Sequence, residues 1–347
     1  MLKTLIAGAF FGTALSFVAA QQQCNGHAEF CSKRYSELTY VLTHNSYAYT
    51  ENPASTQMCD ISAQLADGVR GLKLSALKTN SSSSDNTIHL CHTSCSILDA
   101  GPAVNTLSAI TSWVKDNPND ILTIFWNNPN YDFHASDFVD PYTQSGLVNY
   151  SYVQSPYNTT WPTLQEIIAS GKRVINFLDV NADQKNVPWL MSEFDYVFET
   201  PYDNNNESSF SCTIDRPQDP SDPSAMMYGM NHFLYGTLPF GNPPIQIPQE
   251  ASADVTNSDS SLLKQANTCK QTFGRNPNFL IVDFYNKGQT LQIAAELNNV
   301  TYSNSSVLQC DLKQTTNSDS NSTSDAPHVS FSPLALAVVL FVASLAI

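Results

Sequence analysis

Short segments that favour β-structure recur along the chain, and segments with helical spacing separate several of them. β-branched and aromatic residues dominate YVLTHNSY (40–47), VRGLKLSAL, TIHLCHT, ILTIFWNN, RVINFLDV, DYVFETP, NHFLYG and NFLIVDFYN. Between some of these runs, VNTLSAITSWVKDNP and WPTLQEIIASGK space their apolar residues as amphipathic helices do. Strands that alternate with helices predict βα units and a parallel sheet.

Many of the predicted strands share a layout in which apolar residues come first and polar residues stand at the carboxyl end. These polar ends are His44 and Asn45, Asn127 and Asn128, Asp179, and Asp283 with Asn286. A (β/α) barrel builds its sites at this end of the strands, and a doubly wound open sheet also binds ligands there. The first strand is followed by neither GxGxxG nor GxSxG, and no P-loop motif occurs, which disfavours dinucleotide-binding, α/β-hydrolase and P-loop folds. We predict an α/β fold with one TIM-like (β/α) barrel domain over residues 21–312, either closed or distorted and incompletely closed.

The two ends of the chain differ in composition from the middle. Residues 1–20 contain one lysine, a short apolar stretch and small residues, which is the layout of a cleaved secretory signal. Residues 333–347 form a short apolar tail after the Ser/Thr/Asn-rich spacer 313–332, a pattern typical of a signal for a glycosylphosphatidylinositol (GPI) anchor. Asn321 and Ser324 are the candidate attachment residues. A tail anchor or a marginal membrane helix is the alternative interpretation.

The cysteines and the glycosylation sequons place the mature chain outside the cell. Eight cysteines, an even number, suit a disulfide framework in an oxidising compartment. Proximity favours a bond between Cys24 and Cys31, and Cys212 with Cys269 is a second candidate pair. The predicted glycan acceptors are Asn80, Asn149, Asn158, Asn206, Asn299 and Asn304.

The net charge of the chain limits the classes of binding partner that we expect. A net charge of −15 with only 16 lysines and arginines argues against nucleic acid and against electrostatic docking on anionic lipid. Any membrane contact is therefore expected through the lipid anchor. We expect a monomer without a cofactor.

Two histidines, His44 and His92, stand at strand ends in the first third of the chain. A pair of imidazoles can serve as general base and general acid, and Asp283 is placed to orient the base if its strand lies beside the first. A single histidine on a strand is more often structural. A metal site made by Cys91 and Cys95 with His89 and His92 is an alternative, which an oxidising compartment disfavours.

The order of these motifs resembles the phosphatidylinositol-specific phospholipase C X-domain superfamily, and within it the secreted fungal PLC-like phosphodiesterases. The resemblance rests on THNSY, QLADGVRGLKLSA, IHLCHTSCSILDAGP, WVKDNPNDILTIFW, RVINFLDV with FDYVFETPYD, and NPNFLIVDFYN. It implies cleavage of a phosphoinositide, an inositol glycolipid or a related phosphodiester by attack of an internal hydroxyl. His44 matches the family's general base, His92 rather than His89 its general acid, and Asp283 the aspartate that orients the base.

The second predicted strand departs from the family. Members carry an acidic residue there, followed two positions later by a phosphate-binding arginine or a calcium-binding carboxylate, whereas this chain has Lys73 and Ser75. Both are expected to face the barrel interior, with Leu72 and Leu74 toward the helices. Asn45 resembles a calcium ligand of the eukaryotic members, but calcium needs several oxygen ligands, so we predict no metal.

Four residues are expected to line the substrate site. Lys73 either binds phosphate or pairs with an interior carboxylate such as Asp179 or Asp283, and these two roles stay open. Asp179 can accept hydrogen bonds from vicinal hydroxyls. Asn45 completes this set with Arg70, for which bracing the barrel floor is favoured over phosphate binding.

Two hypotheses follow for the function. The first is an extracellular, metal-independent phosphoric diester hydrolase with His44, His92 and Asp283 as its machinery. The second is a catalytically inactive barrel that binds carbohydrate or lipid at the cell surface or in the wall, which the altered second strand favours.

Overall fold

The computed structural model describes residues 22–79, 86–238, 245–302 and 307–320. The predicted signal and apolar tail lie outside these ranges, as do Asn80, Asn304 and the candidate anchor residues Asn321 and Ser324. Within the described ranges, the helices are all too short or too polar to cross a membrane.

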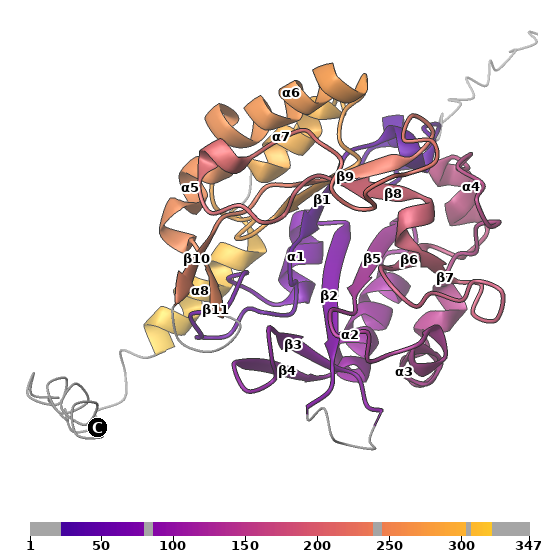
Figure 1. Cartoon of the computed structure of the whole chain (residues 1–347), viewed down its shortest axis with the longest axis horizontal. Helices are drawn as coiled ribbons and strands as arrows, with labels where there is room; N and C mark the ends of the chain where they lie inside the picture. Colours follow the sequence, from indigo (N-terminus) through magenta and orange to yellow (C-terminus); the bar gives the residue numbers. More distant parts are fainter. Residues whose placement is uncertain (1–21, 80–85, 239–244, 303–306, 321–347) are drawn as a thin grey trace, which may run out of the picture.

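Eight parallel strands form one curled sheet in the order β7-β6-β5-β2-β1-β12-β9-β8 (Figure 1). Their bounds are β1 Tyr40–Thr43, β2 Gly71–Leu77, β5 Leu122–Asn127, β6 Val174–Leu178, β7 Leu190–Ser192, β8 Val197–Glu199, β9 Met227–Asn231 and β12 Phe279–Val282. The strands β7 and β8 follow one another in the chain, yet they are the two edges of the sheet. The barrel is therefore open between them, which confirms the predicted α/β barrel in its incompletely closed form.

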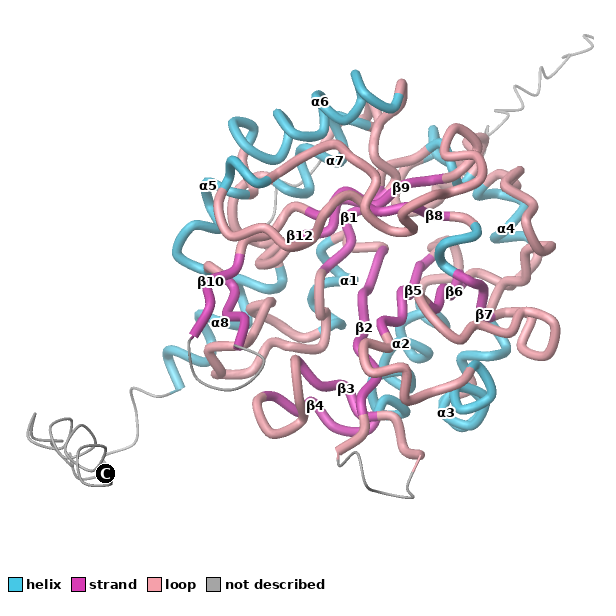
Figure 2. The backbone as a smooth tube through the Cα atoms, in the orientation of Figure 1, coloured by secondary structure: helices cyan, strands magenta, loops and turns pink. Residues whose placement is uncertain are grey.

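Two predicted strands lie elsewhere than the barrel wall. The segment TIHLCHT forms β3 (His89–His92), which pairs antiparallel with the end of β2 and with β4 (Leu98–Pro102). The segment NHFLYG straddles two elements: β9 ends at Asn231, and β10 (Tyr235–Leu238) pairs with β11 (Ile245–Pro248) in a separate ribbon (Figure 2). Both corrections have one cause. β-propensity predicts that a segment is extended, but it does not predict which strand the segment pairs with.

Helices pack mainly on the outer face of the sheet. Their bounds are α1 Ile61–Asp67, α2 Ala103–Asp116, α3 Val139–Ser145, α4 Leu164–Ala169, α5 Ala253–Thr256, α6 Lys264–Phe273, α7 Thr290–Leu297 and α8 Gln309–Ser320. Local chemistry sets several ends. The Asp60 carboxylate accepts from the Ala63 amide at the start of α1, and Gly68, with φ of +112°, ends that helix in the left-handed region.

Single-turn helices complete the secondary structure. The 3₁₀ turns are Ala28–Phe30, Tyr35–Glu37, Ala135–Phe138, Leu147–Tyr150, Glu193–Asp195, Glu207–Ser209 and Glu250–Ser252, and a π turn covers Asp259–Leu263. The turn Glu193–Asp195 bridges the gap between β7 and β8, where a full crossover helix is replaced by a few residues.

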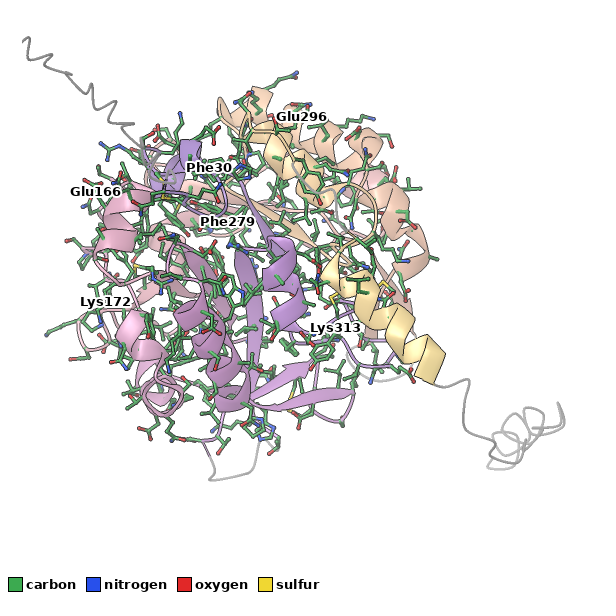
Figure 3. All side chains as sticks on the ribbon, turned by 180° about the vertical axis from the view of Figure 1, so that it is seen from behind. Phe30, Glu166, Lys172, Phe279, Glu296 and Lys313 are labelled. Atoms are coloured by element: carbon green, nitrogen blue, oxygen red, sulfur yellow. A yellow bond between two sulfur atoms is a disulfide. The ribbon has the colours of Figure 1, made fainter. Side chains whose placement is uncertain are left out.

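Alternation along the strands divides the core into two layers. Leu72 and Leu74 belong to the cluster between sheet and helices, and Lys73 between them faces the barrel interior, as predicted. The amino-terminal half of that interior is apolar: Phe30 and Phe279 belong to one buried cluster that closes this end of the barrel (Figure 3). The polar residues that line the large cavity lie at the opposite, carboxyl end of the strands, whereas a buried hydrogen bond between Tyr35 and Thr123 lies within the apolar half.

Four disulfides cross-link segments around this barrel. Cys24–Cys31 and Cys212–Cys269 are the two pairs favoured from the sequence, and Cys59–Cys310 and Cys91–Cys95 complete the set. Cys310 lies in α8, whose Lys313 pairs with Asp60 at 2.6 Å. Helix α8 reaches Ser320, so the segment expected to be a spacer from residue 313 begins as a helix.

Loss of the Cys59–Cys310 bond is expected to cost more stability than loss of Cys24–Cys31. The two bonds span 251 and 7 residues, and closing a longer loop removes more entropy from the unfolded chain. The Cys59→Ser/Cys310→Ser variant should lose about 3–5 kcal/mol. Urea unfolding of the two double variants, compared with the wild type, measures the difference. An equal loss in both variants would contradict this expectation.

Candidate active site

A cavity of about 660 Å³ opens at the carboxyl ends of the strands. Its lining includes His44, Asn45, Lys73, Ser75, His92, Asn127, Asn128, Tyr131, Asp179, Phe194, Tyr202, Arg216, Asn231 and Phe233. Most of the site residues predicted from the sequence therefore meet in one place. Asp283 lies directly behind His44, and Arg70 lies elsewhere.

His44 follows β1 and is held from two sides. Its Nδ1 lies 2.9 Å from Asp283 Oδ1, at the end of β12, because β1 and β12 pair in parallel register. The ring of Phe233 stacks on the imidazole with 4.1 Å between the ring centres. Burial raises the pKa of the Asp283 carboxyl, and the adjacent imidazole opposes this shift. His44 itself keeps 21% of its side chain exposed to the cavity.

Asn45 fixes which nitrogen of His44 carries the proton. The amide oxygen of Asn45 accepts a hydrogen bond from Ser75 Oγ at 2.9 Å, while the Tyr47 hydroxyl, 3.2 Å from the same oxygen, donates to the Cys91 carbonyl at 2.6 Å. The amide nitrogen of Asn45 is then directed at His44 Nε2, 3.2 Å away. This network assigns the proton to Nδ1, which donates it to Asp283, and leaves a lone pair on Nε2. Nε2 is thus the nitrogen available to act as a base.

The same network does not fit a calcium ion. The Asn45 oxygen already accepts a hydrogen bond from Ser75, and Lys73 lines the same cavity. Calcium takes six to eight oxygen ligands, and a nearby ammonium repels it. No step of the chemistry is therefore assigned to a metal.

His92 reaches the cavity from the last position of β3. The Cys91–Cys95 disulfide closes a tight loop around it, and the Thr93 hydroxyl lies 3.3 Å from its Nδ1. Because the two sulfurs are bonded to one another, they cannot serve as thiolate ligands, and the alternative metal site is excluded. Burial, aided by repulsion from His44, lowers the pKa of His92 to about 4.

Acidification is expected to destabilise the fold through His92. An unfolded histidine takes up a proton near pH 6.5, whereas folded His92 does so near pH 4. The corresponding stability is fully present above pH 6.5 and is lost as the pH falls toward 4, by roughly 3 kcal/mol.

Urea unfolding between pH 7 and pH 4 tests this expectation. His92→Gln should show a shallower pH dependence than the wild type, and the comparison removes the effect of other buried groups such as His232, whose pKa burial also lowers to about 4. Parallel curves for the two proteins, or an NMR titration of His92 near pH 6.5, would contradict it.

Lys73 lies in the cavity and in an ion pair at the same time. Its ammonium lies 2.5 Å from Glu199 Oε1, at the end of β8, rather than beside Asp179 or Asp283. The other Glu199 oxygen accepts from Arg216 and from Asn231 Nδ2. The sequence did not single out Glu199 or Arg216. One signal was present: Arg216 is the only lysine or arginine between Lys185 and Lys264.

Of the other predicted site residues, Asp179 lies in the cavity and Arg70 does not. Asp179 lines the cavity, and its Oδ1 accepts from the Asn128 amide at 2.9 Å; burial raises the pKa of its carboxyl. Arg70 stands just before β2 at the amino-terminal end, where it binds Asp120 at 2.9 Å and stacks on Trp113. Arg70 is therefore a structural brace and not a substrate-binding residue, because a strand places its two ends at opposite faces of the barrel.

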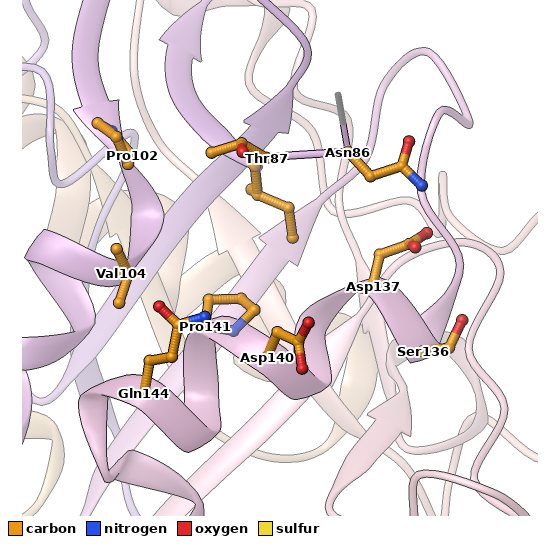
Figure 4. Close-up of a pocket in the computed structure, with 10 residues that line it drawn as sticks. Asn86, Thr87, Pro102, Val104, Ser136, Asp137, Asp140, Pro141 and Gln144 are labelled. Carbon is orange, nitrogen blue, oxygen red and sulfur yellow. The ribbon is translucent and has the colours of Figure 1, made fainter. Parts of the chain in front are cut away.

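Two other cavities lack this chemistry. One of about 410 Å³ lies beside α3, with Asp137, Asp140 and Gln144 on its wall (Figure 4). The other, of about 370 Å³, lies at the amino-terminal end of β1 and includes Arg70. Neither wall contains a histidine paired with a carboxylate, so the cavity at the carboxyl ends is the candidate active site.

Solved structures with a similar fold are bacterial phospholipases. The phosphatidylinositol-specific phospholipase C from Listeria monocytogenes matches 78% of this chain and 96% of its own, with a TM-score of 0.52 and 13% identity. A mutant of the corresponding enzyme from Staphylococcus aureus gives the same TM-score and identity over 78% and 95% of the two chains. The fold thus places the chain in the class of phospholipase C-like α/β barrels.

Sequence comparison identifies the family. The family model for the PI-PLC X domain, described as PI-PLC X 1, matches residues 30–298. A "PI-PLC X domain-containing protein 1" from Arthroderma benhamiae is 33% identical over 79% of this chain and 89% of that protein. An "uncharacterized secreted protein" from the same organism is 37% identical over 80% of this chain, which spans 64% of that relative. The chain belongs to the PI-PLC X-domain family.

Proposed function

We propose that this chain is an extracellular phosphoric diester hydrolase of the phospholipase C type. The proposed substrates are phosphoinositides, inositol glycolipids or related diesters that carry a hydroxyl next to the phosphate. One observation carries the proposal: His44, whose Nδ1 lies 2.9 Å from Asp283 and whose Nε2 keeps the lone pair, lines the same cavity as His92.

The proposed reaction proceeds by internal displacement. His44 Nε2 takes the proton of the neighbouring hydroxyl, and the oxygen of that hydroxyl attacks phosphorus. The bond from phosphorus to the lipid oxygen breaks, and protonated His92 gives its proton to that oxygen. The products are a cyclic phosphodiester and an alcohol, with His44 protonated and His92 neutral. Because the pKa of His92 is about 4 in the free protein, a bound phosphate anion must raise it before this step.

Placement outside the cell is part of this proposal. Support comes from the four disulfides, from the relative named as secreted, and from the sequon asparagines at 149, 158, 206 and 299, all of which are exposed. The proposed lipid anchor would replace the tail 333–347 and hold the cavity near a membrane or wall.

Product analysis tests the activity. The purified mature protein is incubated with phosphatidylinositol vesicles without added metal, and ³¹P NMR follows the appearance of a cyclic phosphate. The His89→Ala variant is a matched control, because His89 binds Asp99 outside the cavity and should leave the rate unchanged. Absence of cyclic phosphate with both phosphatidylinositol and a GPI-anchored test protein would refute the proposal.

One observation favours the second candidate, a catalytically inactive binding protein. Lys73, the cation on β2, is already neutralised by Glu199 at 2.5 Å. If this pair persisted with ligand bound, phosphate would gain little from it. Equal retention of inositol glycolipid by the wild type and His44→Ala, without turnover in either, would support this candidate.

A further inference from the structure

The loop between β8 and β9 brings a second cation to the cavity. Glu199 and Arg216 form an antiparallel bridge in which the Glu199 amide donates to the Arg216 carbonyl at 2.8 Å. The Cys212–Cys269 disulfide ties the same loop to α6. Covalent and backbone restraints therefore hold Arg216 at the cavity wall.

Aromatic rings hold the guanidinium in place. Arg216 Cζ lies 4.7 Å from the ring centre of Tyr202 and 5.6 Å from that of Phe194, and both rings line the same cavity. One guanidinium nitrogen binds Glu199, whereas Nε is buried and has no hydrogen-bond partner among the residues that the structure describes. Because Nε is covered by protein, a ligand in the cavity can contact only the exposed part of the guanidinium group; 27% of the Arg216 side chain is exposed.

Neighbouring charges leave this corner able to accept an anion. Burial raises the pKa of Glu199, but Arg216 and Lys73 outweigh this effect and hold the pKa well below its usual range. Burial and the adjacent Glu199 raise the pKa of Glu193 well above its usual range, which favours its uncharged form. Neither Glu193 oxygen has a hydrogen-bond partner within the described part of the chain. Lys73 and Arg216 thus share Glu199, and Asp179 on the same cavity wall is a second carboxyl near both cations, although burial raises its pKa.

We propose that Arg216, together with Lys73, binds the phosphate oxygens of a phosphodiester monoanion in this cavity. This inference rests on the proposed function and names its charge-stabilising residues. Arg216 supplies from the β8–β9 loop a planar guanidinium that β2 lacks, and planar guanidinium groups bind phosphate in a forked geometry. Bound phosphate then shares both cations with Glu199.

Dimethyl phosphate is a suitable probe, because it is a phosphodiester monoanion without a hydroxyl that could react. NMR titration of the full mature chain measures its binding independently of turnover. Arg216→Gln should bind it roughly tenfold or more weakly, and Arg216→Lys should recover part of the loss because it keeps the charge. Arg275→Gln is the matched control: Arg275 also lies over two aromatic rings, but outside the cavity.

Glu199→Gln gives a result in the opposite direction. Removal of the competing carboxylate should strengthen binding of dimethyl phosphate several-fold, which a merely loosened fold would not do. The proposal is overturned if Arg216→Gln binds as the wild type does, if Arg275→Gln loses binding equally, or if Glu199→Gln weakens binding.

Turnover of phosphatidylinositol separates this inference from the proposed function. Binding that depends on Arg216 without release of cyclic phosphate supports the inference and contradicts the catalytic proposal. Full turnover by Arg216→Gln, with unchanged binding, does the reverse.

Discussion

The His44→Ala variant is expected to lose cleavage of phosphatidylinositol by roughly 10²–10⁴-fold in kcat. Of the two histidines in the described cavity wall, only His44 is oriented by a buried carboxylate: its Nδ1 lies 2.9 Å from Asp283, which leaves the lone pair on Nε2. Its removal leaves the attacking hydroxyl without a base. Initial rates of cyclic phosphate release, measured from pH 5 to pH 8, give kcat and KM.

Asp283→Asn tests the orienting contact separately. The asparagine keeps the size of the side chain but removes the charge that favours a proton on Nδ1, so the lone pair of Nε2 is no longer assured. We expect a fall in kcat with little change in KM, and a changed pH profile. His89→Ala, whose partner Asp99 lies outside the cavity, should behave as the wild type. Cleavage that survives in His44→Ala would remove the basis of the assigned mechanism.

Lys73→Met is expected to reduce the free energy of unfolding by about 3 kcal/mol. Lys73 and Glu199 are 7% and 0% exposed, and their ion pair is 2.5 Å long. Loss of the ammonium leaves Glu199 buried with Arg216 as its one remaining cation. A buried carboxylate that loses a partner retains its desolvation cost, which explains the size of the loss. Urea unfolding at pH 7 measures it.

A double-mutant cycle isolates the ion pair. Lys73→Met combined with Glu199→Gln should lose less stability than the sum of the two single variants, because the second change removes the uncompensated charge. Lys78→Met, one residue beyond the end of the same strand and at an exposed hydrogen bond with Asn86, is the control and should change stability by less than about 0.5 kcal/mol. Additive losses from Lys73 and Glu199 would show that the pair is not coupled.

Local sequence was sufficient for much of the fold and part of the site. Alternating apolar runs identified β1, β2, β5, β6 and β12, and the polar residues after them identified His44, Asp179 and Asp283. Period-two alternation also placed Lys73 and Leu72 on opposite faces of β2. These features depend on the strand period and on the common direction of parallel strands, which are properties of neighbouring residues.

Other site residues were not singled out from the sequence. Glu199 ends a strand of three residues that the run DYVFETP predicted, and Arg216 lies in the loop between β8 and β9, outside the predicted strands and helices. Glu193 lies in a single 3₁₀ turn beside the gap in the barrel. Arg216 lines the cavity, and Glu199 is buried behind its wall, where it pairs with Arg216 and with Lys73 of β2; β2 and β8 are distant both in sequence and in strand order.

The sequence by itself determined the family, the α/β barrel, the two histidines and their aspartate. Each of these features is indicated by a local motif or by the alternation of residues along a strand. Only the tertiary structure decided that the barrel is open between β7 and β8, that Lys73 pairs with Glu199, and that Arg216 reaches the same cavity. The physical reason is that charge pairing and closure depend on distances across the barrel. In a buried site the free energy of an ion pair depends strongly on these distances, and no local pattern of residues encodes them.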